Sequence, residues 1–135
     1  MNKVWVYIEP LENVSTDILE QFKKLNRGYR GRMKNTIGKF IRKELGWDGK
    51  PVIKNPMVFY IKDKDEVLSW GMCYRGRYDP PKHRTVDIYT KLSHRSNGYG
   101  SIIADIMKQE MKHYRLDSAY EYTTIYKRLG YYHYH

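Results

Sequence analysis

The sequence predicts one domain of the α/β class (α+β), over residues 1–135, with the element order β-α-α-β-β-β-α-β-α-β. Three observations support this prediction. The chain has 135 residues, enough for one hydrophobic core and too few for two. Short apolar, β-branched runs alternate with stretches in which apolar residues recur at helical spacing. An extended run, Thr85–Leu92, leads through a glycine-rich turn into a helical pattern, Ile102–Tyr114.

The first half of the chain predicts one strand and two helices. Lys3–Glu9 is apolar and β-branched, as expected for a strand. Ser15–Asp17 offers N-caps for a helix that Gly28 interrupts. A second helix is expected from Asn35, with Gly46 as its stop. The apolar positions at helical spacing in the two helices are Ile18, Phe22, Leu25, Ile37, Phe40, Ile41 and Leu45.

The second half predicts a hairpin and then a strand that leads into a helix. Met57–Lys62 and Val67–Tyr74 are expected to pair across a polar turn. Thr85–Leu92 is the central strand, and the helix after it covers Ser101–Tyr114. The other expected segments are loops at Asp48–Pro56 and Arg75–Arg84, a strand at Asp117–Tyr122, a helix at Thr123–Leu129 and a last strand at Tyr131–His135.

The composition excludes several classes of protein. Hydrophobic residues make up 41% and charged residues 30%, as in soluble globular chains, and no apolar run approaches a membrane span. The N-terminus lacks the long apolar region of a signal peptide. The single cysteine, Cys73, excludes an internal disulfide and a cysteine-based zinc site, and the five histidines give no metal-binding pattern. We expect a cytoplasmic protein, in the host cytoplasm if the chain is viral.

The net charge of +10 is concentrated in one segment. Residues 21–43 hold nine basic residues and no acidic ones, whereas the rest of the chain holds 16 basic and 15 acidic residues. The segment is either a solvated basic face or a docking surface for an anionic partner. The candidate contacts for such a partner are Lys23, Lys24, Arg27, Arg30, Arg32 and Lys34.

The sequence His94–Ser101, H-R-S-N-G-Y-G-S, lies where the central strand turns into a helix. The first N–H groups of a helix have no partner within it, and the helix dipole favours negative charge there. Glycines let the backbone approach a bulky anion, and an arginine adds a charge-assisted fork. The pattern therefore predicts a phosphate or pyrophosphate site, although a tight turn with an ordinary cap would look similar. Its candidate residues are Arg95, Ser96, Asn97, Gly98, Tyr99, Gly100 and Ser101.

Two motifs together give a family resemblance. Arg95-Ser-Asn-Gly98-Tyr-Gly100 fits the pattern [RQ]-x-x-G-x-[GA], and Ile125-Tyr126-Lys-Arg128-Leu129-Gly130-Tyr131 follows it at the separation expected of a second signature. With these motifs, residues 85–131 resemble the GNAT superfamily of N-acetyltransferases. The resemblance implies a mixed, mostly antiparallel sheet of about six strands with about four helices. It also implies acetyl-CoA as the cosubstrate.

The resemblance also assigns roles to individual residues. It implies that the backbone around Thr90 and Leu92 contacts the pantetheine and thioester, while the Arg95–Ser101 loop holds the pyrophosphate. It implies that Tyr126 is the general acid toward the leaving thiolate, because a tyrosine with a pKa of about 10 is protonated at neutral pH.

The general base is the least defined role. Asp87 is the candidate, since strand alternation places it on one face with Thr85 and Tyr89. Glu121 on the next strand is the alternative, or water carries the proton without a base. The chain has Ala119 where the family often has an asparagine, a departure on the acceptor side of the site.

The basic segment suggests the nature of the acceptor. The resemblance implies that the two helices after the first strand form one wall of the acceptor cleft. The expected acceptor is therefore a primary amine that is acidic or carried on an acidic macromolecule: a protein lysine or N-terminus, or aminoacyl-tRNA. The alternative is a non-catalytic binding protein that grips nucleic acid or an acidic protein, with Tyr29 and Phe40 interleaved among the charges. We expect a monomer or a homodimer, with no membrane partner.

Overall fold

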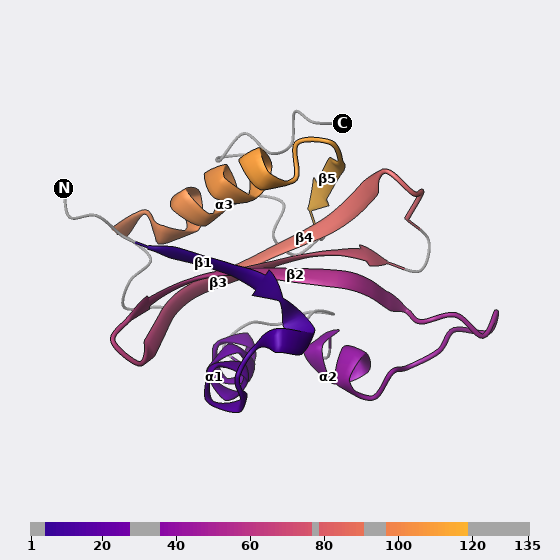
Figure 1. The fold of residues 1–135 in the computed structure, drawn as a ribbon, viewed down its shortest axis with the longest axis horizontal. Helices are drawn as coiled ribbons and strands as arrows, with labels where there is room; N and C mark the ends of the chain where they lie inside the picture. The colour runs from indigo at the N-terminus through magenta and orange to yellow at the C-terminus, as the bar shows by residue number, and fades with distance from the viewer. Residues whose placement is uncertain (1–4, 28–35, 77–78, 91–96, 119–135) are drawn as a thin grey trace.

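The computed structural model describes residues 5–27, 36–76, 79–90 and 97–118. These residues form a five-stranded sheet in the order β1-β2-β3-β4-β5, with three α-helices and one 3-10 helix (Figure 1). The elements are β1 Val6–Pro10, η1 Leu11–Asn13, α1 Thr16–Arg27, α2 Thr36–Ile41, β2 Ile53–Asp63, β3 Glu66–Gly76, β4 His83–Thr90, α3 Tyr99–Glu110 and β5 Arg115–Ser118.

The sheet is mixed and mostly antiparallel, as expected. β1 to β4 pair antiparallel in sequence order, and β5 pairs parallel to β4 after the crossover through α3. The helices α1 and α2 lie below the sheet in Figure 1, and α3 lies above it. No helix within these described ranges is long and apolar enough to cross a membrane.

The element order is confirmed as far as β5, but the expected six strands and four helices are not seen. The described ranges contain five strands and three α-helices. The predicted helix at Thr123–Leu129 and the predicted strand at Tyr131–His135 lie outside the described residues.

The predicted end of the second helix was wrong. Helical spacing extended it to Leu45, whereas α2 ends at Ile41. Lys43 adopts a left-handed conformation with φ of 52°, which ends the helical path. The chain then forms a narrow hairpin in which Leu45 pairs with Pro51. The predicted Asp48–Pro56 loop is correspondingly shorter, because β2 already begins at Ile53.

An aromatic row crosses four strands on the face that α1 covers. The registers align Tyr7 with Tyr60, Tyr60 with Trp70, and Trp70 with Tyr89. Two of these pairs are stacked, with ring centroids 5.2 Å apart for Tyr7 and Tyr60 and 5.1 Å apart for Trp70 and Tyr89. Phe22 of α1 stacks on Trp70 at 4.4 Å. The row therefore connects the strands to one another and to α1.

The opposite face fits α3 closely against β3. A Cβ atom added at Gly71 would lie 3.0 Å from the terminal methyl of Met107 and 3.1 Å from a methyl of Ile103. Both helix residues are fully buried. The missing side chain at Gly71 is thus what allows α3 to approach the centre of the sheet.

We expect Phe22→Ala to lower the free energy of unfolding by about 3–5 kcal/mol, because it removes a fully buried ring from the centre of the aromatic row. Urea unfolding followed by circular dichroism measures the change. The matched control is Trp47→Ala, since that side chain is 85% exposed and its removal leaves no cavity. Equal losses in the two variants would contradict the assigned role of Phe22.

Candidate active site

The turn between β4 and α3 is built around Gly98. This residue is the N-cap of α3 and adopts a left-handed conformation with φ of 76°. It makes no side-chain cap, and no acidic residue lies in the first helical turn. The first turn of α3 therefore places no negative charge of its own beside its free N–H groups, which suits an incoming anion.

The two glycines of the turn have different constraints. A Cβ atom at Gly98 would meet no atom within 4 Å, so the backbone conformation, and not space, favours glycine there. A Cβ atom at Gly100 would lie 3.4 Å from Oγ1 of Thr90, an ordinary contact. This agrees with the [GA] choice at that position of the motif. Thr90 is fixed in turn by Ser69, whose hydroxyl lies 2.8 Å from the Thr90 hydroxyl.

The structure brings together several of the predicted cofactor residues. Thr90 ends β4, and Gly100 in the first turn of α3 lies directly against it. Asn97, Tyr99 and Ser101 belong to the same turn and helix start. The other predicted residues of this site, Leu92, Arg95, Ser96 and Tyr126, lie outside the described residues.

Asp87 lies in the middle of β4, opposite Met72 of β3. The register places it on the face of the aromatic row with Thr85 and Tyr89, as strand alternation predicted. Its carboxylate is completely buried. Nε1 of Trp70 and the hydroxyl of Tyr89 are also buried in this layer, so the sheet encloses a small set of polar groups on the α1 side. A role for Asp87 as general base remains a prediction.

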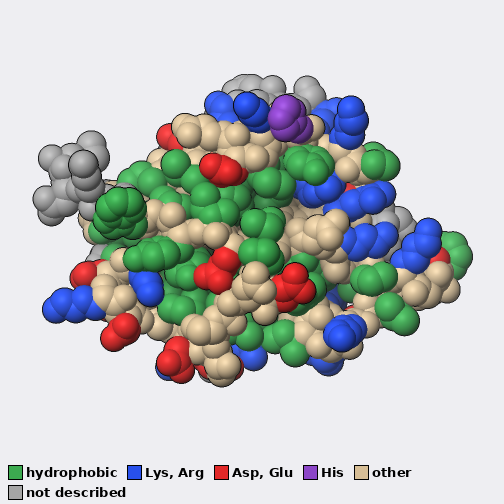
Figure 2. All heavy atoms as spheres, viewed as in Figure 1, with side chains coloured by type: hydrophobic (Ala, Val, Ile, Leu, Met, Phe, Trp, Pro, Cys, Tyr) green, Lys and Arg blue, Asp and Glu red, His purple; other side chains and the backbone are tan. Residues whose placement is uncertain are grey.

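The predicted basic contacts are only partly described. Lys23 pairs with Glu20 at 3.3 Å, and Lys24 is exposed on α1. Arg27 is the last residue of α1, while Arg30, Arg32 and Lys34 lie outside the described residues. Figure 2 shows Lys and Arg side chains gathered toward the right of the view, with hydrophobic side chains and a few acidic ones across the middle.

The hairpin after α2 was missed by the sequence reasoning. The N–H of Gly46 donates to the carbonyl of Lys50 at 2.8 Å, and the N–H of Gly49 donates to the carbonyl of Gly46 at 3.0 Å. This turn holds Trp47 at its tip with 85% of the side chain exposed. Gly46 and Gly49 were the signal that could have predicted this turn. The helical spacing instead makes Gly46 the expected stop of a longer helix.

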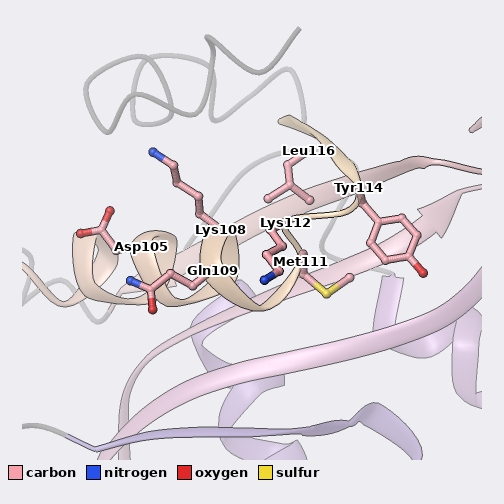
Figure 3. A pocket seen from close by; sticks show the side chains of 7 residues that line it. All are labelled: Asp105, Lys108, Gln109, Met111, Lys112, Tyr114 and Leu116. Atoms are coloured by element: carbon pink, nitrogen blue, oxygen red, sulfur yellow. The ribbon is translucent and has the colours of Figure 1, made fainter.

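A pocket of about 440 Å³ lies along the outer side of α3 (Figure 3). Figure 3 shows that its lining side chains come from α3, the turn after it and β5, with Lys108 extending away from the helix. The lining residues are Asp105, Lys108, Gln109, Met111, Lys112, Tyr114 and Leu116. This pocket does not include Gly98 or Thr90, so it is not the space at the glycine turn.

No protein-family model and no curated protein matches the chain. Solved structures do match it. A predicted acetyltransferase from Clostridium acetobutylicum, solved with acetyl-CoA, shares 11% identity at a TM-score of 0.60 over 95% of this chain and 89% of that one. A putative acetyltransferase of the GNAT family from Desulfovibrio desulfuricans shares 9% identity at a TM-score of 0.62, over 92% of this chain and 83% of that one. A glucosamine-6-phosphate N-acetyltransferase from Arabidopsis thaliana shares 12% identity at a TM-score of 0.56, over 96% of this chain and 91% of that one.

The fold is that of the GNAT acetyltransferases. The sequence resemblance, which rested on two short motifs, is thereby confirmed for the fold over more than nine-tenths of the chain. Within this GNAT fold the first motif lies at the β4–α3 turn, and its glycines have the conformation and the packing just described.

Cys73 is part of the core of the GNAT fold and not a nucleophile at its surface. The thiol is buried in β3, and that burial raises its pKa to about 12. Thiol chemistry needs the thiolate, so burial and the raised pKa both disfavour reaction of the native thiol at neutral pH. The described residues also contain no group of three side chains suited to hold a metal ion.

We expect Cys73 in the native protein not to react with dithionitrobenzoate at pH 8, and to react once per chain in denaturant. The release of thionitrobenzoate measures both. Because burial favours the neutral thiol, the unfolded state loses this proton first as the pH rises above the ordinary pKa. The Cys73 contribution to stability therefore decreases between that pH and about 12. Rapid native labelling at pH 8 would contradict the assignment.

Proposed function

We propose that this protein is an acetyl-CoA-dependent N-acetyltransferase that moves an acetyl group to a primary amine. The observation that carries the proposal is Gly98. Its left-handed conformation opens the start of α3 at the end of β4, in a fold shared with acetyltransferases. An acetyl thioester supplies an activated acyl group, so the tasks left to the protein are to hold it, to position the amine and to manage protons.

The proposal gives each predicted residue a task. The Arg95–Ser101 loop holds the pyrophosphate through backbone N–H groups and the arginine fork. The backbone around Thr90 and Leu92 orients the pantetheine and the thioester carbonyl. The Thr90 hydroxyl is itself held by Ser69, which supports this end of β4 as a fixed platform.

Proton transfer is assigned to two further groups. Tyr126 donates a proton to the thiolate as the carbon–sulfur bond breaks. Asp87, whose carboxylate is buried, accepts the proton that the attacking amine loses, with or without an intervening water. Glu121 is the alternative base, and direct proton loss to water is the third route.

The acceptor in this proposal is an amine on an acidic macromolecule, either a protein lysine or N-terminus or an aminoacyl-tRNA. The support is the charge of residues 21–43, nine basic residues without an acid. The contacts proposed on this surface are Lys23, Lys24, Arg27, Arg30, Arg32 and Lys34. A basic surface raises the local concentration of an anionic acceptor and speeds its encounter with the site.

We expect acetyl-CoA to bind with micromolar affinity and Gly98→Glu to abolish that binding, because the new side chain adds bulk and negative charge where the pyrophosphate lies. Isothermal titration calorimetry measures the affinity, with desulfo-CoA and ATP as comparison ligands. Gly49→Glu is the matched control, since Gly49 also has a positive φ, 75°, and empty space around it, but lies in the hairpin after α2.

Equal binding of acetyl-CoA by Gly98→Glu and Gly49→Glu would remove the glycine turn as the anion site. If the folded wild-type protein binds no acetyl-CoA, the alternative is a non-catalytic GNAT-fold protein that grips nucleic acid or an acidic protein. The exposed Trp47 close to the basic segment favours that alternative. Affinity for RNA that falls steeply with salt would then identify a phosphate partner.

We expect Tyr126→Phe to lower the turnover number by about 10²-fold while leaving acetyl-CoA affinity within a factor of two, because only proton donation is lost. The released CoA thiol is measured by dithionitrobenzoate, without background from Cys73. The control is Tyr7→Phe, which removes a hydroxyl from the partly exposed Tyr7 of β1, outside the proposed cofactor loop. Wild-type activity of Tyr126→Phe across the pH range would refute the general-acid role.

A further inference from the structure

A second pocket, of about 560 Å³, lies at the end of the sheet where β1 stops and β2 and β4 begin. In Figure 1 this is the side on which β2 begins, and the glycine turn is at the opposite end of α3, where that helix begins. Its walls are mostly apolar and come from segments far apart in the sequence, including Ile8, Pro10, Met57, Phe59, Met111 and Tyr114. The volume is within the range typical of small-molecule sites.

Arg84 is the one cationic side chain in this lining and is only 8% exposed. Its Nη1 donates to the carbonyls of Pro81 and His83, both at 2.8 Å. The guanidinium lies over the ring of Tyr114, with 4.0 Å from Cζ to the ring centroid. These contacts fix the plane of the guanidinium and shield it from water.

The guanidinium has no carboxylate partner in the described part of the chain, where the ion pairs are Lys23–Glu20 and Arg42–Glu44. Its Nε and Nη2 form no hydrogen bond with any described residue. Burial of a cation without a counter-ion is costly, and two neutral carbonyls offset only part of that cost. A planar anion that occupies Nε and Nη2 would compensate the charge with two parallel hydrogen bonds.

The rim of the pocket limits the charge of such an anion. Glu12 and Glu110 are both exposed residues of the lining. Glu110 also ends α3, where the helix dipole already disfavours negative charge. These two rim carboxylates repel a ligand that carries two or more negative charges more strongly than a ligand that carries one. The single buried cation, Arg84, can compensate only one of those charges. Phosphate groups and nucleic acids are therefore poor ligands for this pocket.

The pocket is also built on an irregular piece of backbone. The register of β2 shifts between Lys54 and Met57, and Asn55 within that shift has a φ of 51°. Asn55 is part of the lining. Bulges that redirect a strand are frequent beside binding sites. Here the bulge lies at the start of β2, in the same pocket lining as Arg84.

We propose that this pocket binds a small monocarboxylate with an apolar body, its carboxylate on the guanidinium of Arg84 and its body against Met57, Phe59 and Met111. The site is separate from the glycine turn, because Arg84 lies at the start of β4 and Thr90 at its end, with α3 running back between them. The inference therefore does not depend on the proposed acetyltransferase activity.

The test uses octanoate as the probe, with octylamine and inorganic phosphate as comparison ligands, in calorimetry and in amide chemical-shift mapping of the full chain. We expect octanoate to bind with shifts at Asn55, Met111 and Tyr114, and neither comparison ligand to bind there. Binding of octylamine as tight as that of octanoate, or displacement of octanoate by phosphate, would overturn the proposal.

Two variants and a control locate the ligand. Arg84→Met should weaken octanoate binding by about tenfold or more, because the charged hydrogen bonds are lost. Arg42→Met removes the same charge from an exposed side chain and should leave affinity unchanged. Glu110→Gln should tighten binding severalfold by removing a repulsive rim charge, and this readout is independent of whether Arg84→Met folds.

Unchanged affinity in Glu110→Gln, or an equal loss in Arg84→Met and Arg42→Met, would overturn the assignment. Gly98→Glu separates this site from the proposed acetyl-CoA site, because it should abolish acetyl-CoA binding and leave octanoate binding intact. Competition between octanoate and acetyl-CoA in the wild-type protein would show one shared site and would likewise overturn the inference.

Discussion

The stacking of Phe22 on Trp70 is the interaction on which the arrangement of this molecule depends. Trp70 lies on β3, and its ring stacks on Phe22 of α1 and on Tyr89 of β4. Tyr60 contacts Phe22 edge-on and stacks on Tyr7. A one-residue slip of any strand would turn its ring to the other face, so this row also fixes the strand register. The aromatic row thereby fixes the position of β4, and with it the positions of the residues at both ends of that strand.

The unit of β4 and α3 has two ends with different chemistry. At the end of β4, the Gly98 turn presents the start of a helix with no acidic residue in its first turn, which suits an anion. At the start of β4, Arg84 is buried beneath Tyr114 next to apolar walls and two rim carboxylates, which suits one carboxylate on an apolar body. The two proposed anion sites thus lie at opposite ends of one strand and helix, and they differ in the charge that they would accept.

The charge of the chain is distributed unevenly. The nine basic residues of residues 21–43 are followed by a hydrogen-bonded hairpin that exposes Trp47. An exposed indole close to basic residues is suited to a large anionic partner, as acceptor or as binding partner. The Arg84 pocket, with acid at its rim, would repel that same partner. The two surfaces therefore differ in the charge that they present to a ligand.

The sequence by itself determined the order of the elements as far as β5, the hairpin of β2 and β3, and the strand-turn-helix around Gly98, because these depend on local periodicity and on glycine. It also indicated the GNAT fold, since two motifs in order restrict the fold more than either does alone. Only the tertiary structure decided where α2 ends, because the pairing of Leu45 with Pro51 outweighs a helical pattern. Tertiary structure also decided that Arg84 is buried in β4, whereas the sequence predicts a loop over Arg75–Arg84. The burial of Arg84, without a counter-ion among the described residues, depends on residues from η1, β2 and α3 that are far apart in the sequence and meet only in the fold.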